Sequence, residues 1–186
     1  MSSNDNYLAS TMLRARLQEI TDSNDISSHG ALIELARQCA PHTIELLTGP
    51  NDNRRYNCVM FALGIEVDPE YFAMAYRCPD GIHASTQFIQ FLVDRGYLVE
   101  RESQGAGALI AYLEDGQFRH IGIIAEGGRV RSKWGIGHLY EHSRFETPAS
   151  YGSSVRIFEP MEREAVLDAF FEFAELHGVT FGNTNG

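Results

Sequence analysis

The chain has 186 residues, of which 44% are hydrophobic and 22% are charged, and these values are typical of one globular domain. Its 25 acidic residues outnumber its 15 basic residues, which gives a formal net charge of −10 with neutral histidines. Such a charge argues against nucleic acid or an anionic membrane as the partner. No apolar run approaches the roughly 20 residues that a membrane-spanning helix needs, so we expect no membrane span.

The cysteines and the first residues indicate the compartment. Cys39, Cys58 and Cys78 form neither a CxxC motif nor a CxxxH cluster, a pattern that suits free thiols in a reducing environment. Residues 1–10 show neither the basic region nor the apolar region of a signal peptide. We therefore expect a cytoplasmic protein, or one that is exported by a secretion system that needs no signal peptide.

The N-terminal part, residues 7–50, is expected to be helical. The spacing of its apolar residues predicts a helix over 7–20 and a second helix that Ser27 or Ser28 caps. Residues 48–53, Thr-Gly-Pro-Asn-Asp-Asn, form the clearest loop signal in the chain.

The core of the chain, residues 54–158, is expected to begin with a short buried helix. Asn57 is a favoured N-cap residue, and an apolar run follows Cys58, so we predict a helix that starts at or just after Asn57. An amphipathic helix is predicted over 85–97, with Gly96 as its stop.

Beyond this helix the hydrophobic period changes to two, which predicts an antiparallel meander. Asp115-Gly116 and Gly127-Gly128 are the turn signals between its strands. The predicted strands cover 108–113, 118–125, 129–134 and 154–158, and a closing helix covers 160–178. Helices followed by an antiparallel sheet and a closing helix indicate an α+β fold, which we expect to form a single domain over 1–186.

Cys58 and His120 occupy the positions in the chain that are best suited to catalysis by a nucleophilic thiol. The free N–H groups at a helix start stabilise a thiolate and lower the pKa of a cysteine there. His120 shares a strand face with Gly122, whose missing side chain would let a helix approach closely. A thiol at a helix start facing a histidine on a sheet is the arrangement that nucleophilic thiol catalysis requires. On local sequence alone, the commoner roles are a buried apolar residue for Cys58 and a surface strand residue for His120.

Several short motifs occur in a fixed order through the core. They are Tyr56-Asn57-Cys58, Gly96-Tyr97, Ala108–Tyr112, His120-Ile121-Gly122, Ser132-Lys133-Trp134-Gly135, His142, Pro148 and Tyr151-Gly152. This ordered set resembles the NlpC/P60-like, papain-like cysteine hydrolases, and in particular a little-characterised group of bacterial domains within that class. The resemblance covers about residues 54–158 and implies a papain-like α+β fold, with Cys58 as nucleophile and His120 as general base.

The resemblance also implies a third catalytic residue at Ser132. Members of that class commonly keep His, Asn or Gln there, so the serine is a departure. Strand register tests this position independently. If 126–128 form a three-residue loop with a bulge, Ser132 lies opposite Gly122, on the face of His120. If two glycines alone form the turn, Lys133 lies there instead. We prefer Ser132.

Neighbouring residues are candidates for supporting roles. Asn57, often Asp in that class, and Tyr56 are candidates for oxyanion stabilisation or positioning, although Tyr56 serves equally well as packing under the preceding loop. Lys133, Trp134 and His142 are candidates for a substrate cleft. We expect Lys133 to pair with an acidic neighbour, since a cation beside the catalytic histidine would oppose formation of the imidazolium.

Alternative roles remain open for the last residues of this region. Trp134 suits the core as well as a cleft wall, and His142 suits ordering of the loop after the meander. His138 and His142 have the spacing of metal ligands on a helix. The intervening Gly137 and the lack of a third nearby ligand argue against this, so we expect no metal and no cofactor.

The resemblance implies hydrolysis of an amide, peptide or other acyl bond through a thioester on Cys58. The expected substrate is a peptide or protein, and the peptidoglycan stem peptide is one candidate. A bacterial effector or toxin, with an inhibitor or immunity partner, suits an acidic chain without a signal peptide better than a housekeeping wall enzyme, because the wall is itself anionic. The alternative is a non-catalytic acidic binding or immunity-type protein that retains the fold.

Overall fold

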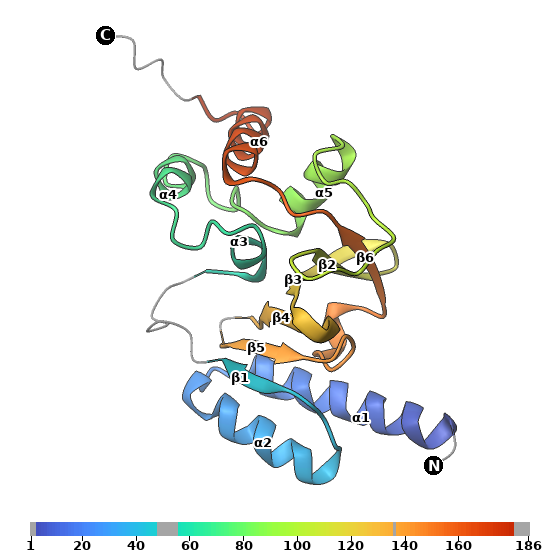
Figure 1. Ribbon diagram of the computed structural model, residues 1–186. Helices are drawn as coiled ribbons and strands as arrows, with labels where there is room; N and C mark the ends of the chain where they lie inside the picture. The colour runs from blue at the N-terminus through green and yellow to red at the C-terminus, as the bar shows by residue number, and fades with distance from the viewer. Residues whose placement is uncertain (1–2, 48–55, 136, 181–186) are drawn as a thin grey trace.

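A six-stranded antiparallel sheet forms the centre of the structure, a computed structural model that describes residues 3–47, 56–135 and 137–180, with side chains from residue 10 onward (Figure 1). The strand order is β1-β5-β4-β3-β2-β6. The strands are β1 (Glu45–Leu47), β2 (Leu109–Glu114), β3 (Gln117–Ile124), β4 (Val130–Lys133), β5 (Leu139–His142) and β6 (Ser154–Phe158). The α+β class and the antiparallel meander are therefore confirmed. The loop predicted over 48–53 lies outside the described residues.

Helices precede, interrupt and follow the sheet in the chain, and most of them were predicted. They are α1 (Ser3–Asp22), α2 (His29–Cys39), α3 (Cys58–Ala62), α4 (Pro69–Ala75), α5 (Thr86–Asp94) and α6 (Arg163–Leu176), with short 3-10 helices η1 (Ile26–Ser28), η2 (Glu126–Gly128) and η3 (Ala149–Tyr151). Helix α4 was not predicted, although it has a clear local start signal. The Asp68 carboxylate accepts hydrogen bonds from the N–H groups of Glu70 and Tyr71, and Pro69 is the first helical residue.

The first turn of the meander has the geometry that its sequence indicates. Asp115 and Gly116 have φ values of 51° and 76°, and a type I′ hairpin turn requires positive φ at both positions. Glu114 therefore pairs with Gln117 across the turn.

The second turn follows the three-residue alternative. Ile123 pairs with Arg131 and Ile124 with Val130, which is the register that a loop over 126–128 produces. This register confirms the preferred alternative and carries Ser132 onto the same face as His120 and Gly122.

Strands β1 and β5 were not predicted. Strand β5 pairs with β4, Val130 lying opposite His142, and β1 pairs with β5 on the outside, Leu46 lying opposite Tyr140. Both strands are too short for a hydrophobic period to be recognised, so their neighbours in the sheet stabilise them more than their own sequences do. His142 consequently belongs to a strand and not to a loop after the meander.

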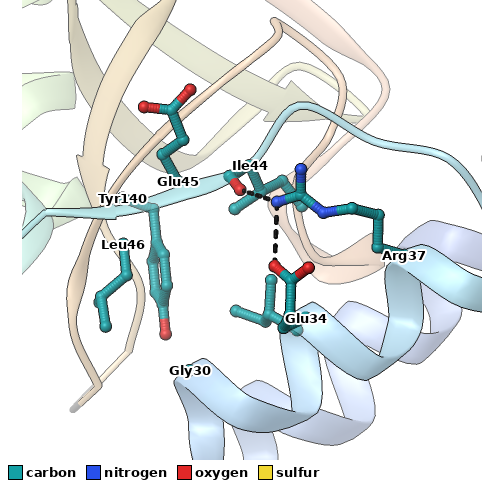
Figure 2. A pocket seen from close by; sticks show the side chains of 8 residues that line it. Gly30, Glu34, Arg37, Ile44, Glu45, Leu46 and Tyr140 are labelled. Carbon is teal, nitrogen blue, oxygen red and sulfur yellow. Dashed lines mark hydrogen bonds and ion pairs between the residues drawn. The ribbon is translucent and has the colours of Figure 1, made fainter.

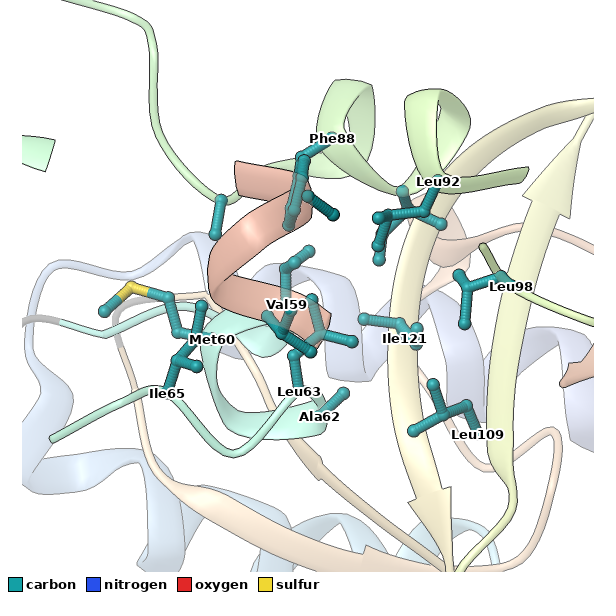
Figure 3. Packing of buried hydrophobic residues seen from close by; sticks show 14 of the residues in the cluster. Val59, Met60, Ala62, Leu63, Ile65, Phe88, Leu92, Leu98, Leu109 and Ile121 are labelled. Carbon is teal, nitrogen blue, oxygen red and sulfur yellow. The ribbon is translucent and has the colours of Figure 1, made fainter. Parts of the chain in front are cut away.

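Each face of the sheet has its own core, because side chains alternate along the strands. The face that we call the α3 face carries Ala111 and Ile121 and packs against α3, α5 and α6. Figure 3 shows Val59 of α3 and Leu63, the residue after this helix, beside Ile121, with Leu92 of α5 completing the same cluster. This packing holds the first turn of α3 against β3.

The opposite face, which we call the α1 face, carries Tyr112 and Val130 in the middle of the sheet. Towards β5, Trp134 and Tyr140 pack in one cluster with apolar residues of α1 and α2. Those helical residues are Leu13, Leu17, Ile20 and Ile33. The N-terminal helices therefore share a core with the sheet.

Gly122 lies on the α1 face, where its missing side chain makes room for β4 and not for a helix, contrary to the sequence-based expectation. A Cβ atom at this position would lie 2.7 Å from the Arg131 carbonyl oxygen and 2.9 Å from the Ser132 Cβ.

We predict that Gly122→Ala lowers the free energy of unfolding by about 1–3 kcal/mol, measured by urea denaturation. Gly105→Ala is the control, since its nearest new neighbour would lie 3.9 Å away. Equal effects in the two variants would contradict the close approach of β3 and β4.

Candidate active site

Asn57 fixes the start of α3 and thereby the position of Cys58, the first residue of that helix. The Asn57 Oδ1 atom accepts a hydrogen bond from the Met60 N–H at 2.9 Å, and its Nδ2 donates to the Ala84 carbonyl at 2.7 Å. The predicted N-cap is therefore confirmed. Because both ends of the amide are committed to the backbone, this geometry makes Asn57 a positioning residue and does not leave it free to act as an oxyanion donor.

The Cys58 sulfur lies where β4 separates from β3. The ladder between these two strands reaches only as far as Ile123. Ile124 donates its N–H to the carbonyl of Ala108, the residue before β2, at 2.8 Å, so the N–H of Ile121, three residues earlier, points to the opposite side of β3. The Cys58 thiol interacts with that N–H group, on the side of β3 that faces away from β2.

His120 lies on the α1 face, paired with Tyr112. Its ring stacks on Tyr151 with 3.8 Å between ring centroids and 17° between ring planes. His120 is 2% exposed, and its Nε2 atom is buried without a hydrogen-bond partner in the described part of the chain. The expectation that α3 faces His120 across one sheet face is wrong, because α3 packs on Ile121 and strand alternation turns His120 to the other side.

Lys133 and Tyr151 both lie within electrostatic range of the Cys58 thiol. Lys133, on the α3 face, is close enough to Cys58 for its ammonium to lower the pKa of the thiol. Tyr151, on the α1 face, is close enough to Cys58 for a charge on the sulfur to raise the pKa of the phenol. Tyr151 therefore stacks on the imidazole of His120 and lies within electrostatic range of the thiol.

Burial dominates the electrostatics of both candidate residues. It raises the pKa of Cys58, and the nearby backbone N–H groups and Lys133 only partly oppose this effect. It also lowers the pKa of His120 well below 6.5, and His142 adds to the shift. Both groups are consequently neutral at pH 7. The expected lowering of the thiol pKa is wrong for this conformation, because the loss of solvation outweighs the N–H groups of a five-residue helix.

Ser132 shares the face of His120, but its hydroxyl is bonded elsewhere. The Nδ1 atom of His142 lies 2.9 Å from the Ser143 carbonyl oxygen and therefore carries the proton. The Nε2 atom of His142 then accepts from the Ser132 hydroxyl at 2.9 Å, while the Trp134 indole donates to the same hydroxyl at 3.0 Å. No hydrogen bond joins Ser132 to His120 among the described residues, so the serine orients His142 in this structure.

The residues predicted to line a substrate cleft lie in the interior. Lys133 is 2% exposed, Trp134 is 1% exposed and His142 is fully buried. The Lys133 ammonium donates to the Gly137 carbonyl and lies 4.5 Å from the centre of the Tyr56 ring. Tyr56 thus packs its ring against a buried cation, and none of the three cleft candidates faces an open cleft in this conformation.

A pocket of about 280 Å³ lies elsewhere, between α2, β1 and β5 (Figure 2). Arg37 forms an ion pair with Glu34 at 3.2 Å and donates to the Ile44 carbonyl at 2.9 Å. The Tyr140 hydroxyl is buried without a partner among the described residues. The lining residues are Gly30, Ile33, Glu34, Arg37, Ile44, Glu45, Leu46 and Tyr140, so none of the candidate catalytic residues belongs to this pocket.

Neither a metal site nor a membrane-spanning helix is found among the described residues. Within the described ranges, no three His, Cys, Asp or Glu side chains gather closely enough to hold a metal ion. His138 instead places its Nε2 atom 3.1 Å from the Ile26 carbonyl oxygen. None of the described helices is long and apolar enough to cross a membrane.

We predict that the protein loses stability in mild acid because two of its histidines are buried in the neutral form. Burial lowers the pKa of His142 to about 4 and that of His120 well below 6.5, so the unfolded chain binds protons first as the pH falls through 6.5. Each buried histidine contributes its full stabilisation above this pH. The free energy of unfolding should therefore fall by about 1 kcal/mol per histidine between pH 7.5 and 5.5. Urea denaturation at several pH values measures the slope. His142→Gln should reduce it, and the exposed His83→Asn should not; equal slopes in all three proteins would contradict the buried neutral state.

We predict that Cys58 and Cys39 are alkylated at different rates. Because burial raises the pKa of Cys58, iodoacetamide at pH 7.5 should label it more slowly than the exposed Cys39 in the same sample. The Cys58 rate should climb as the pH rises above the ordinary thiol value, and Lys133→Met should slow labelling further by removing a nearby cation. Peptide mass spectrometry quantifies each site. Faster labelling of Cys58 than of Cys39 would show that the thiol is activated without any opening.

A comparison with known protein families matches residues 47–159 to a domain of unknown function, DUF7689. The matched segment runs from the last residue of β1 to the residue after β6 and contains Cys58 and His120, whereas α1, α2 and α6 lie outside it. No match was found among solved structures. Since the family model covers more than half of the chain, the protein belongs to the DUF7689 family.

Proposed function

We propose that this protein is a papain-like cysteine hydrolase in which Cys58 is the nucleophile and His120 is the general base. The observation that carries the proposal is the unpartnered Nε2 atom of His120, buried next in the chain to Ile121, whose N–H meets the Cys58 thiol. A buried nitrogen without a partner costs free energy, and a thiol proton would supply the missing interaction. The order of the motifs in the sequence supports the same assignment.

The neutral state of both groups sets the chemistry. As the sulfur attacks the carbonyl carbon, the S–H proton passes to His120 Nε2 and the S–C bond forms. The imidazolium gives this proton to the leaving amine or alcohol when the C–N or C–O bond breaks, which leaves a thioester on Cys58. His120 then takes a proton from water, which hydrolyses the thioester and restores the thiol. The Lys133 ammonium and the Ile121 N–H stabilise the oxyanion.

The proposed substrate is a peptide or protein that offers an amide or another acyl bond. The peptidoglycan stem peptide is one form of such a substrate, and a bacterial effector or toxin is the proposed setting. A peptide has to reach a buried imidazole and a partly buried thiol, so the described conformation corresponds to a resting state of the proposed enzyme.

An activated ester tests this proposal without knowledge of the natural substrate. We expect p-nitrophenyl acetate to transfer one acetyl group to Cys58 and to release p-nitrophenolate, followed by turnover as the thioester hydrolyses. Peptide mass spectrometry locates the acetyl group, and absorbance follows the released phenolate. Cys58→Ser and His120→Gln should each lower the rate by about 100-fold or more, the scale of a lost general base.

The remaining thiols provide the control for this experiment. Cys39→Ser and Cys78→Ser should leave turnover unchanged, because both residues lie outside the proposed catalytic pair. Acetylation of Cys39 and Cys78 in proportion to their exposure, with none on Cys58 in a protein shown to be folded, would remove the proposed mechanism.

The second candidate is a non-catalytic acidic binding or immunity-type protein that retains the fold. The raised pKa of Cys58 and the lowered pKa of His120 favour it, since a neutral buried pair is typical of packed interiors. In that case Cys58→Ala should leave stability and partner binding close to those of the wild type, and ester turnover should be absent from both proteins.

A further inference from the structure

The segment 147–152, which contains η3, is held by the N-terminal helix. Arg14 of α1 donates to four of its carbonyl oxygens, and Gln18, one turn further along the helix, accepts from the Ser150 N–H at 2.9 Å. The four acceptors of Arg14 are the carbonyl oxygens of Thr147 (3.3 Å), Pro148 (3.3 Å), Ala149 (3.3 Å) and Gly152 (2.6 Å). A single cation thus satisfies four backbone groups that lie far away in the sequence.

The same segment lays Tyr151 on His120. The phenol ring is stacked on the imidazole, and its hydroxyl accepts a hydrogen bond from the Gly135 N–H at 3.0 Å. Gly152 has a φ of 104°, and a Cβ atom there would lie 2.3 Å from the Leu113 carbonyl oxygen. The segment is therefore pressed against β2, and Tyr151 covers the imidazole of His120 on the α1 face.

We propose that Arg14 holds Tyr151 closed over His120 and that release of this contact opens the catalytic centre. This inference rests on the proposed function, because it concerns access to the same two residues. Arg14 lies outside the segment that matches the family model, whereas the segment it holds lies inside. Through this contact, a helix that precedes the family domain in the chain controls access to the two candidate residues within that domain.

Loss of Arg14 weakens the closed state more than it weakens the fold. The helix keeps its own attachment, because Leu13 and Leu17 are buried against Trp134 and Tyr140. The carbonyl groups of the segment, by contrast, lose their charged donor and can bind water once the segment moves outwards. The expected change is local opening over 147–152 and not release of α1.

The test compares Arg14→Ala with Arg16→Ala. Arg16 is the matched control, since it lies on the same helix in an exposed ion pair with Glu19 and makes no described contact with the segment. Two quantities are measured in the full-length protein: hydrogen–deuterium exchange of 147–152, and iodoacetamide labelling of Cys58 relative to Cys39. We expect both to rise roughly tenfold in Arg14→Ala, the scale of one lost charge-assisted hydrogen bond in a local opening equilibrium. Neither should change in Arg16→Ala.

Other results of the two measurements would overturn separate parts of the proposal. Unchanged exchange in Arg14→Ala overturns the holding role, and faster exchange with unchanged Cys58 labelling overturns the guarding role. If Arg14→Ala fails to fold, as judged by circular dichroism, Gln18→Ala decides with a smaller increase in the same two measurements. An increase in labelling without ester turnover in any variant removes the proposed hydrolase but leaves the control of access by Arg14 in place.

Discussion

The packing of α3 on β3 determines where the other candidate residues lie. Val59 and Leu63 pack with Ile121, and this contact brings the first residue of the helix to the Ile121 N–H group. Strand alternation then sends His120 to the opposite face. The two side chains thus lie on opposite sides of β3, at the point where its ladder with β4 ends.

Burial and reactivity are opposed in this centre. The start of a helix stabilises a nearby negative charge by about 0.3–1 kcal/mol at an exposed site, whereas removal of a thiolate from water shifts its pKa in the other direction by a larger amount. The structure accordingly holds Cys58 and His120 neutral. Entry of water would relieve both shifts at once, lowering the pKa of the thiol and raising that of the imidazole. Opening and chemical activation would therefore be a single event.

Local signals in the sequence were sufficient to predict the start of a helix and the register of a hairpin. Asn57 marks the start of α3, and Asp115-Gly116 fixes the first hairpin register. The face of His120 was also within reach of sequence reasoning, because an apolar helix packs on the apolar face of a strand. Ile121 and Ile123 form that face of β3, which leaves His120 on the other side.

The remaining features depend on contacts that no local pattern encodes. Strand β5 forms because β4 lies beside it, and its formation brings His142 to Ser132. Arg14 binds carbonyl oxygens, which every residue possesses, so the sequence carries no mark of its partners. Its position in α1 becomes significant only after Leu13 and Leu17 have packed on the sheet and set the distance between the helix and segment 147–152. Apolar packing, in which Tyr151 itself takes part, thus positions the helix, and Arg14 on its edge adds the polar contacts that hold segment 147–152.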